Sequence, residues 1–142
     1  MKFKSRKTLF LGLIIWITTI LLLSYSFIFY FQEGLNKEFF IFLSISLITV
    51  SFFLWIWLDT YYEIKDNYLH YKSGPIFGKI EIDRIKKITT NKTMYVGLKP
   101  ALATKGLIIN YDRYSDIYIS PVTPWLFIET LKKTNPNIII EK

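Results

Sequence analysis

Two long apolar runs near the N-terminus constrain the fold of this chain more than any other feature. Leu9–Phe31 and Phe39–Leu58 contain no Asp, Glu, Lys, Arg or His. A helix rises about 1.5 Å per residue, so each run is long enough to cross a hydrocarbon core of roughly 30 Å. Lipid offers no water to backbone polar groups, so each span must be helical. The sequence therefore predicts a transmembrane helical hairpin over residues 9–58 and a second, more polar domain over residues 59–142.

The charges that flank these runs predict the orientation of the hairpin. Residues 1–8 form a basic N-terminus with four cations and no acid: Lys2, Lys4, Arg6 and Lys7. The short loop between the runs has Glu33 and Glu38 against Lys37. Lys and Arg accumulate on the cytoplasmic side of spans, so both termini are expected in the cytoplasm and the protein in the inner membrane. A cleaved signal peptide is the weaker interpretation, because the first run is longer than a typical signal and no A-x-A site follows it.

The chain lacks the residues that several classes of protein function require. The chain has no cysteine, which excludes disulfides and thiolate metal sites. Ionisable residues inside a span are the usual mark of an ion or substrate path, and the apolar runs carry none. The single histidine, His70, has no obvious nucleophile beside it, and no ligand spacing points to a metal or another cofactor. Asp112 and Asp116 flank a short turn, and turn chemistry explains them better than acid–base catalysis. We therefore expect a protein that is not an enzyme and binds no cofactor.

From Thr60 onward the apolar pattern changes to a period of two, which is typical of strands. The expected strands are Thr60–Lys65, Tyr68–Ser73, Ile76–Asp83, Lys87–Thr90, Lys105–Tyr111 and Asp116–Ser120. Asp66-Asn67 and Gly74-Pro75 are predicted turns between the first three strands. Meander spacing of this kind indicates an antiparallel sheet.

One helix is expected near the C-terminus. Thr123 is a candidate N-cap, Pro124 suits the first helical position, and Asn135-Pro136 ends the helix. Its apolar stripe, at helical spacing, consists of Phe127, Ile128 and Leu131. The apolar segment Ile138–Ile140 fits either an edge strand or loose packing on the domain.

Six or seven strands followed by one helix is the plan of a pleckstrin-homology (PH) domain. The residues that carry a closer resemblance are, in order, Tyr62-x-Ile64, Leu69, Gly74-Pro75, Ile82-x-x-Ile85, Tyr111 and Ile119-Ser120-Pro121. Through them, the stretch from Thr60 to Ile138 resembles the bacterial PH-like domain family, in particular its YyaB-like group. The resemblance implies an antiparallel β-barrel or sandwich capped by one helix, so the whole chain is α+β. It also implies no enzymatic activity, and many of those proteins join two N-terminal membrane helices to this domain.

One segment departs from the pattern of that family. Members commonly have Ser-x-Asp-Arg where this chain has Ala103-Thr104-Lys105-Gly106. An acid–arginine pair that would anchor the loop is therefore missing from this sequence.

The candidate binding site is a basic run near the expected fourth strand. It consists of Arg84, Lys86, Lys87 and Lys92, which lie within nine residues. Such cations can contact anionic lipid headgroups, each contributing about 1 kcal/mol near the surface. A solvated strand face is the alternative, and nucleic acid is not expected because no recognition motif accompanies the charge.

Together these features predict a membrane-anchored PH-like protein that acts as a non-catalytic binding or scaffold module at the inner membrane. Its expected partners are the lipid bilayer and either a protein or anionic lipid, and the hairpin offers a surface for oligomerisation. Bacteriocin self-immunity is the alternative, because small basic membrane proteins with PH-like domains occur in such roles. A toxin or export cluster beside the gene would favour that alternative.

Overall fold

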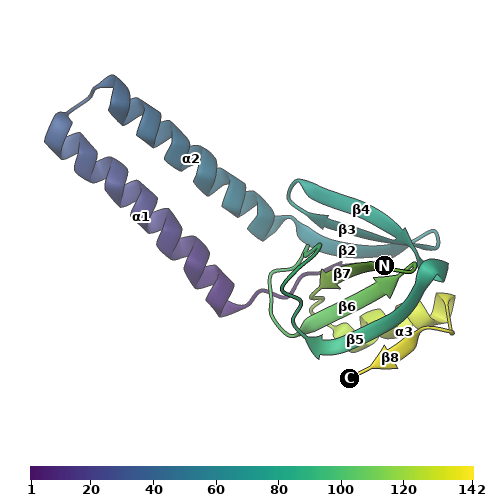
Figure 1. Ribbon diagram of the computed structural model, residues 1–142. Helices are drawn as coiled ribbons and strands as arrows, with labels where there is room; N and C mark the ends of the chain where they lie inside the picture. The colour runs from purple at the N-terminus through teal and green to yellow at the C-terminus, as the bar shows by residue number, and fades with distance from the viewer.

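A long helical hairpin projects from one end of a β-rich domain (Figure 1). The computed structural model describes residues 1–142, apart from the side chain of Glu33. The first helix, α1 (Leu9–Glu33), and the second, α2 (Lys37–Leu58), lie antiparallel and are joined by a short loop. Gly34 has a φ of 72° in this loop, and the Asn36 side chain caps α2 by accepting a hydrogen bond from the Phe39 N–H at 2.8 Å.

Both helices are long and apolar enough to cross a membrane. The most apolar 18-residue stretches of the two helices have mean hydropathies of 2.1 and 2.4. Only 17% of this stretch in α1, and 6% in α2, is buried within the protein. The core helix of a soluble protein would be mostly covered, whereas these two expose apolar side chains along most of their length. Where the helices meet, the Ser26 and Ser46 hydroxyls lie 3.1 Å apart. Small polar residues of this kind let helices approach closely in an apolar environment.

The first sheet has the strand order β1-β2-β3-β4 and is antiparallel throughout. It contains β1 (Lys2–Lys4), β2 (Thr60–Lys65), β3 (Tyr68–Ser73) and β4 (Ile76–Glu81). Asp66 and Asn67 both have positive φ, which is the geometry of a two-residue hairpin turn and confirms the predicted turn. Strand β1 was not expected from the sequence, because residues 1–8 read only as a basic N-terminus.

The second sheet has the order β7-β6-β5-β8. It contains β5 (Ile85–Lys92), β6 (Gly106–Tyr111), β7 (Ser115–Ile119) and β8 (Ile139–Glu141). The 3₁₀ turn η1 (Ile82–Arg84) joins the two sheets. A register shift between Ile85 and Lys87 allows Ile85 and Ile88 both to face the core although they lie three residues apart. Strand β8 runs parallel to β5, so the end of the chain forms an edge strand.

The two sheets face each other as a sandwich, not as a closed barrel, and α3 (Pro124–Thr134) closes the space between them. Phe127 and Leu131 of α3 are fully buried, and Ile128 packs at the edge of the same cluster. The Phe127 ring lies 5.1 Å from that of Phe3 in β1 and 6.2 Å from that of Tyr62 in β2. Edge-to-face pairs at these distances add to the energy of burial.

The ends of α3 differ in one respect from expectation. Thr123 is the N-cap residue, but its side chain makes no capping hydrogen bond, so that part of the prediction was wrong. The other end stops as predicted, and Asn135 explains the stop. Its side-chain amide donates to the carbonyls of Ile82 at 3.0 Å and Ile85 at 3.2 Å, which ties the helix end to the joint between the sheets.

Phe3 offers a direct test of whether the N-terminal strand belongs to the domain. Its side chain is buried in the same cluster as Phe127 and Leu131. Phe3→Ala should lower the free energy of unfolding of the domain by about 3–5 kcal/mol, because it removes a core ring and leaves a cavity. Pulse proteolysis of the detergent-solubilised full chain across a urea series measures this change. The same substitution at the exposed Phe77 is the control and should shift stability by less than about 0.5 kcal/mol.

Candidate functional site

The four cations predicted to contact lipid are spread along β5 and do not form one patch. Strand β5 begins at the end of the domain remote from the helices and ends on the helix side (Figure 1). Arg84 precedes the strand and forms a two-pronged ion pair with Asp112, with Nε 2.6 Å from Oδ1. Lys87 lies mid-strand and pairs with Glu141 of β8 at 3.0 Å. The structure brings only Lys92 close to the helices.

The two ion pairs lower the capacity of this run to attract an anion. Hydrogen bonding to Asp112 raises the pKa of Arg84, and the hydrogen bond from Lys87 lowers the pKa of Glu141. Both cations are therefore balanced by a fixed carboxylate at neutral pH. Lys86 and Lys92 are exposed, and neither takes part in an ion pair with the side chains that the structure describes.

The joint between α2 and the first sheet is short and clamped. Asp59 alone separates the helix from β2, and its carboxylate accepts from Lys72 Nζ at 2.7 Å and from the Trp55 indole N–H at 3.2 Å. Hydrogen bonding to Lys72 lowers the pKa of Asp59 and raises that of Lys72, which keeps the pair charged. The clamp thus joins the last turn of α2 to β3 across the strand between them.

The joint on the other side, between β1 and α1, is equally ordered. The backbone N–H groups of Ser5, Arg6 and Thr8 donate to carbonyls of Thr60, Ser120 and Leu102 at 2.6–3.2 Å. The Arg6 guanidinium also donates to the carbonyls of Thr104 and Lys105. Residues 5–8 are therefore bound along their length to the domain, and the helices leave it without a flexible linker.

The Tyr62 hydroxyl connects four segments beneath these joints. It donates to the Pro100 carbonyl at 2.7 Å, accepts from the Ser120 N–H at 3.1 Å, and lies 3.2 Å from the Ser5 hydroxyl. Ser5 in turn lies 3.0 Å from the Ser120 hydroxyl. Burial raises the pKa of Tyr62, so the phenol keeps its proton and its donor role. A single buried side chain thus holds β2, the N-terminal segment, the end of β7 and the loop before β6.

The loop that lacks the acid–arginine pair of the family is held by a second buried tyrosine. The Tyr118 hydroxyl donates to the Ala103 carbonyl and accepts from the Gly106 N–H, both at 2.8 Å. Gly106 cannot carry a side chain here, because a Cβ would lie 2.3 Å from the Ile119 carbonyl oxygen. Backbone contacts to Tyr118 therefore fix the segment Ala103–Gly106.

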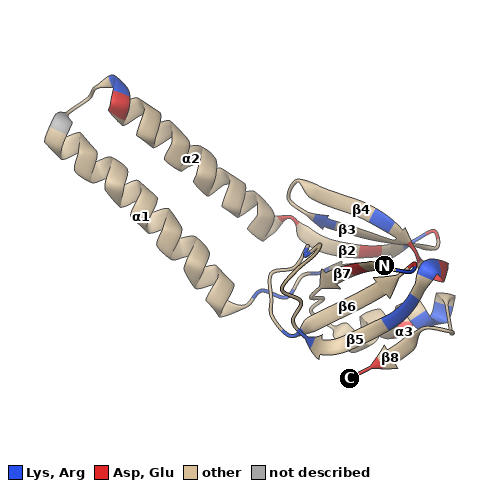
Figure 2. Ribbon diagram, in the orientation of Figure 1, with Lys and Arg blue, Asp and Glu red and all other residues tan. Residues whose placement is uncertain are grey.

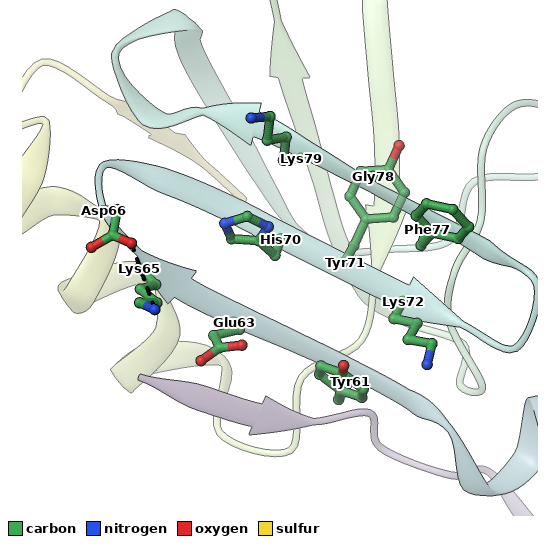
Figure 3. A pocket seen from close by; sticks show the side chains of 10 residues that line it. All are labelled: Tyr61, Glu63, Lys65, Asp66, His70, Tyr71, Lys72, Phe77, Gly78 and Lys79. Atoms are coloured by element: carbon green, nitrogen blue, oxygen red, sulfur yellow. Dashed lines mark ion pairs between the residues drawn. The ribbon is translucent and has the colours of Figure 1, made fainter.

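A groove of about 780 Å³ lies on the outer face of the first sheet, opposite the core (Figure 3). Strand register aligns its side chains in rows: Tyr61, Lys72 and Phe77 in one, and Glu63, His70 and Lys79 in the next. Lys65 and Asp66 form an ion pair at 3.7 Å at one end. Gly78 leaves room for Tyr71, whose hydroxyl lies 2.3 Å from where a Cβ would be.

The groove combines aromatic surface with charge of both signs. Lys2 of β1 lies 3.6 Å from the centre of the Tyr61 ring, and Lys79 lies 4.7 Å from that of Tyr68. His70 is half-buried between Glu63 and Lys79. Among the side chains that the structure describes, no three His, Asp or Glu residues come together to hold a metal ion. The sequence pattern did not reveal this groove, although the alternation of each strand already placed these residues on the outer face.

Comparison with known proteins supports the fold. Residues 60–135 match the family described as "Bacterial PH domain". The chain belongs to this bacterial PH domain family, which confirms the resemblance carried by its strand and turn residues. It is also 31% identical over 88 residues to the "Uncharacterized protein YyaB" of Bacillus subtilis (strain 168). The alignment covers 61% of this chain and 60% of that protein. No solved structure matches the chain.

Tyr62→Phe tests the role of the buried hydroxyl without changing the packing of the ring. Loss of the hydroxyl leaves the Ser120 N–H and the Pro100 carbonyl without this partner, so the domain should lose about 1–3 kcal/mol of stability. Urea unfolding of the full chain in detergent, followed by pulse proteolysis, gives the value. Tyr61→Phe is the control, because its ring lies on the outer face. An equal loss of stability in both variants would show that the buried hydrogen bonds of Tyr62 contribute no more than a tyrosine hydroxyl on the outer face.

Proposed function

We propose that this protein is a non-catalytic binding module anchored in the inner membrane, with its PH-like domain held at the cytoplasmic surface. The observation that carries the proposal is the pair of clamped joints between the helices and the first sheet. Only 17% of the apolar stretch of α1 and 6% of that of α2 is covered by the protein, so the hairpin needs an apolar environment, which a bilayer supplies. Strands β1 and β2 then hold the domain directly beneath it.

The pairing of β1 with β2 supports a single side for both ends of the chain. Lys2, Phe3 and Lys4 oppose Glu63, Tyr62 and Tyr61, so the segment before α1 and the domain after α2 occupy the same compartment. The acid-free basic segment over residues 1–8 favours the cytoplasm for that compartment. The loop over residues 34–36 would then lie on the opposite face.

The groove on the outer sheet face supports binding of a protein partner. Lys72 lies between its aromatic residues, Tyr61 and Phe77, and Lys79 lies in the next row. Aromatic side chains are enriched at protein–protein interfaces. The face is the side of a sheet whose strands lead into the helices, so a bound partner would be held beside the membrane.

The orientation can be tested with single cysteines, because the chain has none of its own. Leu35→Cys lies in the interhelical loop and Tyr114→Cys at the exposed far end of the domain. We expect a membrane-impermeant maleimide to label position 35 in intact spheroplasts, and position 114 only after permeabilisation. The reverse pattern would place the domain outside the cell. Labelling of both positions without permeabilisation would show that the helices do not span the membrane.

The binding surface can be tested by photocrosslinking in cells. A benzophenone amino acid at position 70 lies in the groove, whereas one at position 114 lies at the far end of the domain. We expect a discrete crosslinked protein from position 70 that disappears when the charges on either side of it are exchanged, in Glu63→Lys/Lys79→Glu. Position 114 is the matched control and should give none. Equal crosslinking from both positions, or persistence in the Glu63→Lys/Lys79→Glu variant, would contradict binding in the groove.

A further inference from the structure

We propose that the end of the domain from which the helices leave is itself a lipid-contacting surface, in which two exposed apolar tips enter the headgroup layer of an anionic bilayer. This helix-side surface comprises the β3–β4 turn with the first residues of β4 (Gly74–Phe77) and the β5–β6 loop (residues 93–105), together with the basic segment over residues 5–8. The inference rests on the proposed function, because it requires that the helices span the membrane.

The first tip is fixed beside the last turn of α2. Gly74 packs so closely on the helix that a Cβ at this position would lie 2.8 Å from the Ile56 side chain, and its N–H donates to the Asp59 carbonyl at 3.3 Å. The residues that follow, Ile76 and Phe77, are exposed, Phe77 by 76%. An apolar turn level with the last turn of a spanning helix lies at the membrane interface.

The second tip comes from the β5–β6 loop, whose base is bound to the residues just before α1. Thr8 donates its N–H to the Leu102 carbonyl at 2.9 Å, and the Thr104 N–H lies 3.3 Å from the Thr8 hydroxyl. The loop rises toward the end of α2 (Figure 1). It exposes Tyr95 by 87% and Val96 by 86%. Two adjacent, almost fully exposed apolar side chains are unusual on a water-facing loop, but they suit an interface.

The charge around the tips favours an anionic bilayer as the occupant of this surface. Residues 1–8 and residues 91–105 both contain no Asp or Glu. Their exposed cations near the helix bases are Arg6, Lys7, Lys92, Lys99 and Lys105. In Figure 2 the segment that leads into α1 and the loop before β6 accordingly carry blue positions among tan ones. Asp59 is already neutralised by Lys72 at 2.7 Å.

The position of the surface commits it to lipid and not to a protein. The headgroup layer adds roughly 5–8 Å to each side of the hydrocarbon core, as the difference between about 30 Å and 40–45 Å implies. Because the joints are clamped and no linker separates the helices from the sheets, the helix-side surface stays next to that layer while the helices span, and the charge around the Tyr95–Val96 tip decides how far that tip enters it. Aromatic side chains and Lys or Arg are the residues that this layer favours.

The test uses single-cysteine variants of the full chain, labelled with the environment-sensitive dye NBD. Tyr95→Cys and Phe77→Cys report on the two tips. Tyr114→Cys is the matched control, because this tyrosine is 86% exposed in the turn at the opposite end. Ile48→Cys, 69% exposed in α2, reports on the span. The labelled proteins are reconstituted in phosphatidylcholine/phosphatidylglycerol vesicles that carry a nitroxide quencher either near the headgroups or deep in the acyl chains.

We expect shallow quenching and a blue shift at positions 95 and 77, neither at position 114, and deep quenching at position 48. Deep quenching at 48 with emission at 95 and 77 unchanged, as at 114, would overturn the lipid-contacting surface and leave the proposed function intact. Absence of quenching at 48 would overturn the spanning hairpin and the inference with it. The two failures are therefore distinguishable in one set of measurements.

The contribution of charge is tested in the Tyr95→Cys background. Lys92→Gln/Lys99→Gln should reduce shallow quenching at low salt, and the effect should vanish in pure phosphatidylcholine vesicles or at high salt, where charges are screened. Lys86→Gln/Lys132→Gln removes the same charge elsewhere on the domain and should leave quenching unchanged. An equal reduction in both pairs would show that net charge alone, and not this surface, attracts the lipid.

Discussion

The pairing of β1 with β2 is the interaction on which the rest of the structure depends. It joins residues 2–4 to residues 61–63 across the whole helical hairpin, and so closes the hairpin at the end opposite its short loop. Closing such a long loop costs conformational entropy, and the buried Phe3 ring and the Tyr62 hydroxyl network offset that cost. The ladder also aligns the two helix bases, because only residues 5–8 and Asp59 intervene. Without β1, α1 would be attached to the domain only through residues 5–8 and through α2.

The sequence predicted the elements whose pattern is local. The period-two runs gave β2 and β3 to the residue, and Phe127 and Leu131 identified the buried face of α3. Strand β1 could not be predicted from the sequence, because three residues are too few to show an alternation of apolar and polar side chains. The partner of Phe3 also lies about 60 positions later in the chain. The four cations of residues 1–8 were explained by the preference of Lys and Arg for the cytoplasmic side of a membrane span. The sequence likewise allows either a strand or loose packing at Ile138–Ile140, because β8 is defined only by its parallel pairing with β5.

The candidate sites show that residues close together in the sequence need not form one surface, whereas residues far apart in the sequence can. Residues in a strand advance about 3.3 Å each, so a basic run from Arg84 to Lys92 extends over roughly 25 Å and cannot form a compact patch. Ion pairs with Asp112 and Glu141 reduce its charge further. Conversely, residues 5–8 and the loop over residues 93–105 are far apart in the sequence but lie together at the helix bases. Sequence proximity located the cations, whereas the topology decides which of them act together.

The clamped joints also relate the two proposed surfaces to each other. Phe77 lies in one row of the groove with Tyr61 and Lys72, and it follows closely on Gly74, which packs beside Ile56 of α2. Under the proposed membrane placement, one end of the groove therefore meets the headgroup layer, and its successive rows follow β2, β3 and β4 away from that layer. A partner in the groove would contact the sheet and the bilayer surface at once. Because Asp59 leaves no freedom at the joint, the membrane would then act as a second wall of the binding site, and affinity measured on the domain in detergent should be lower than in a bilayer.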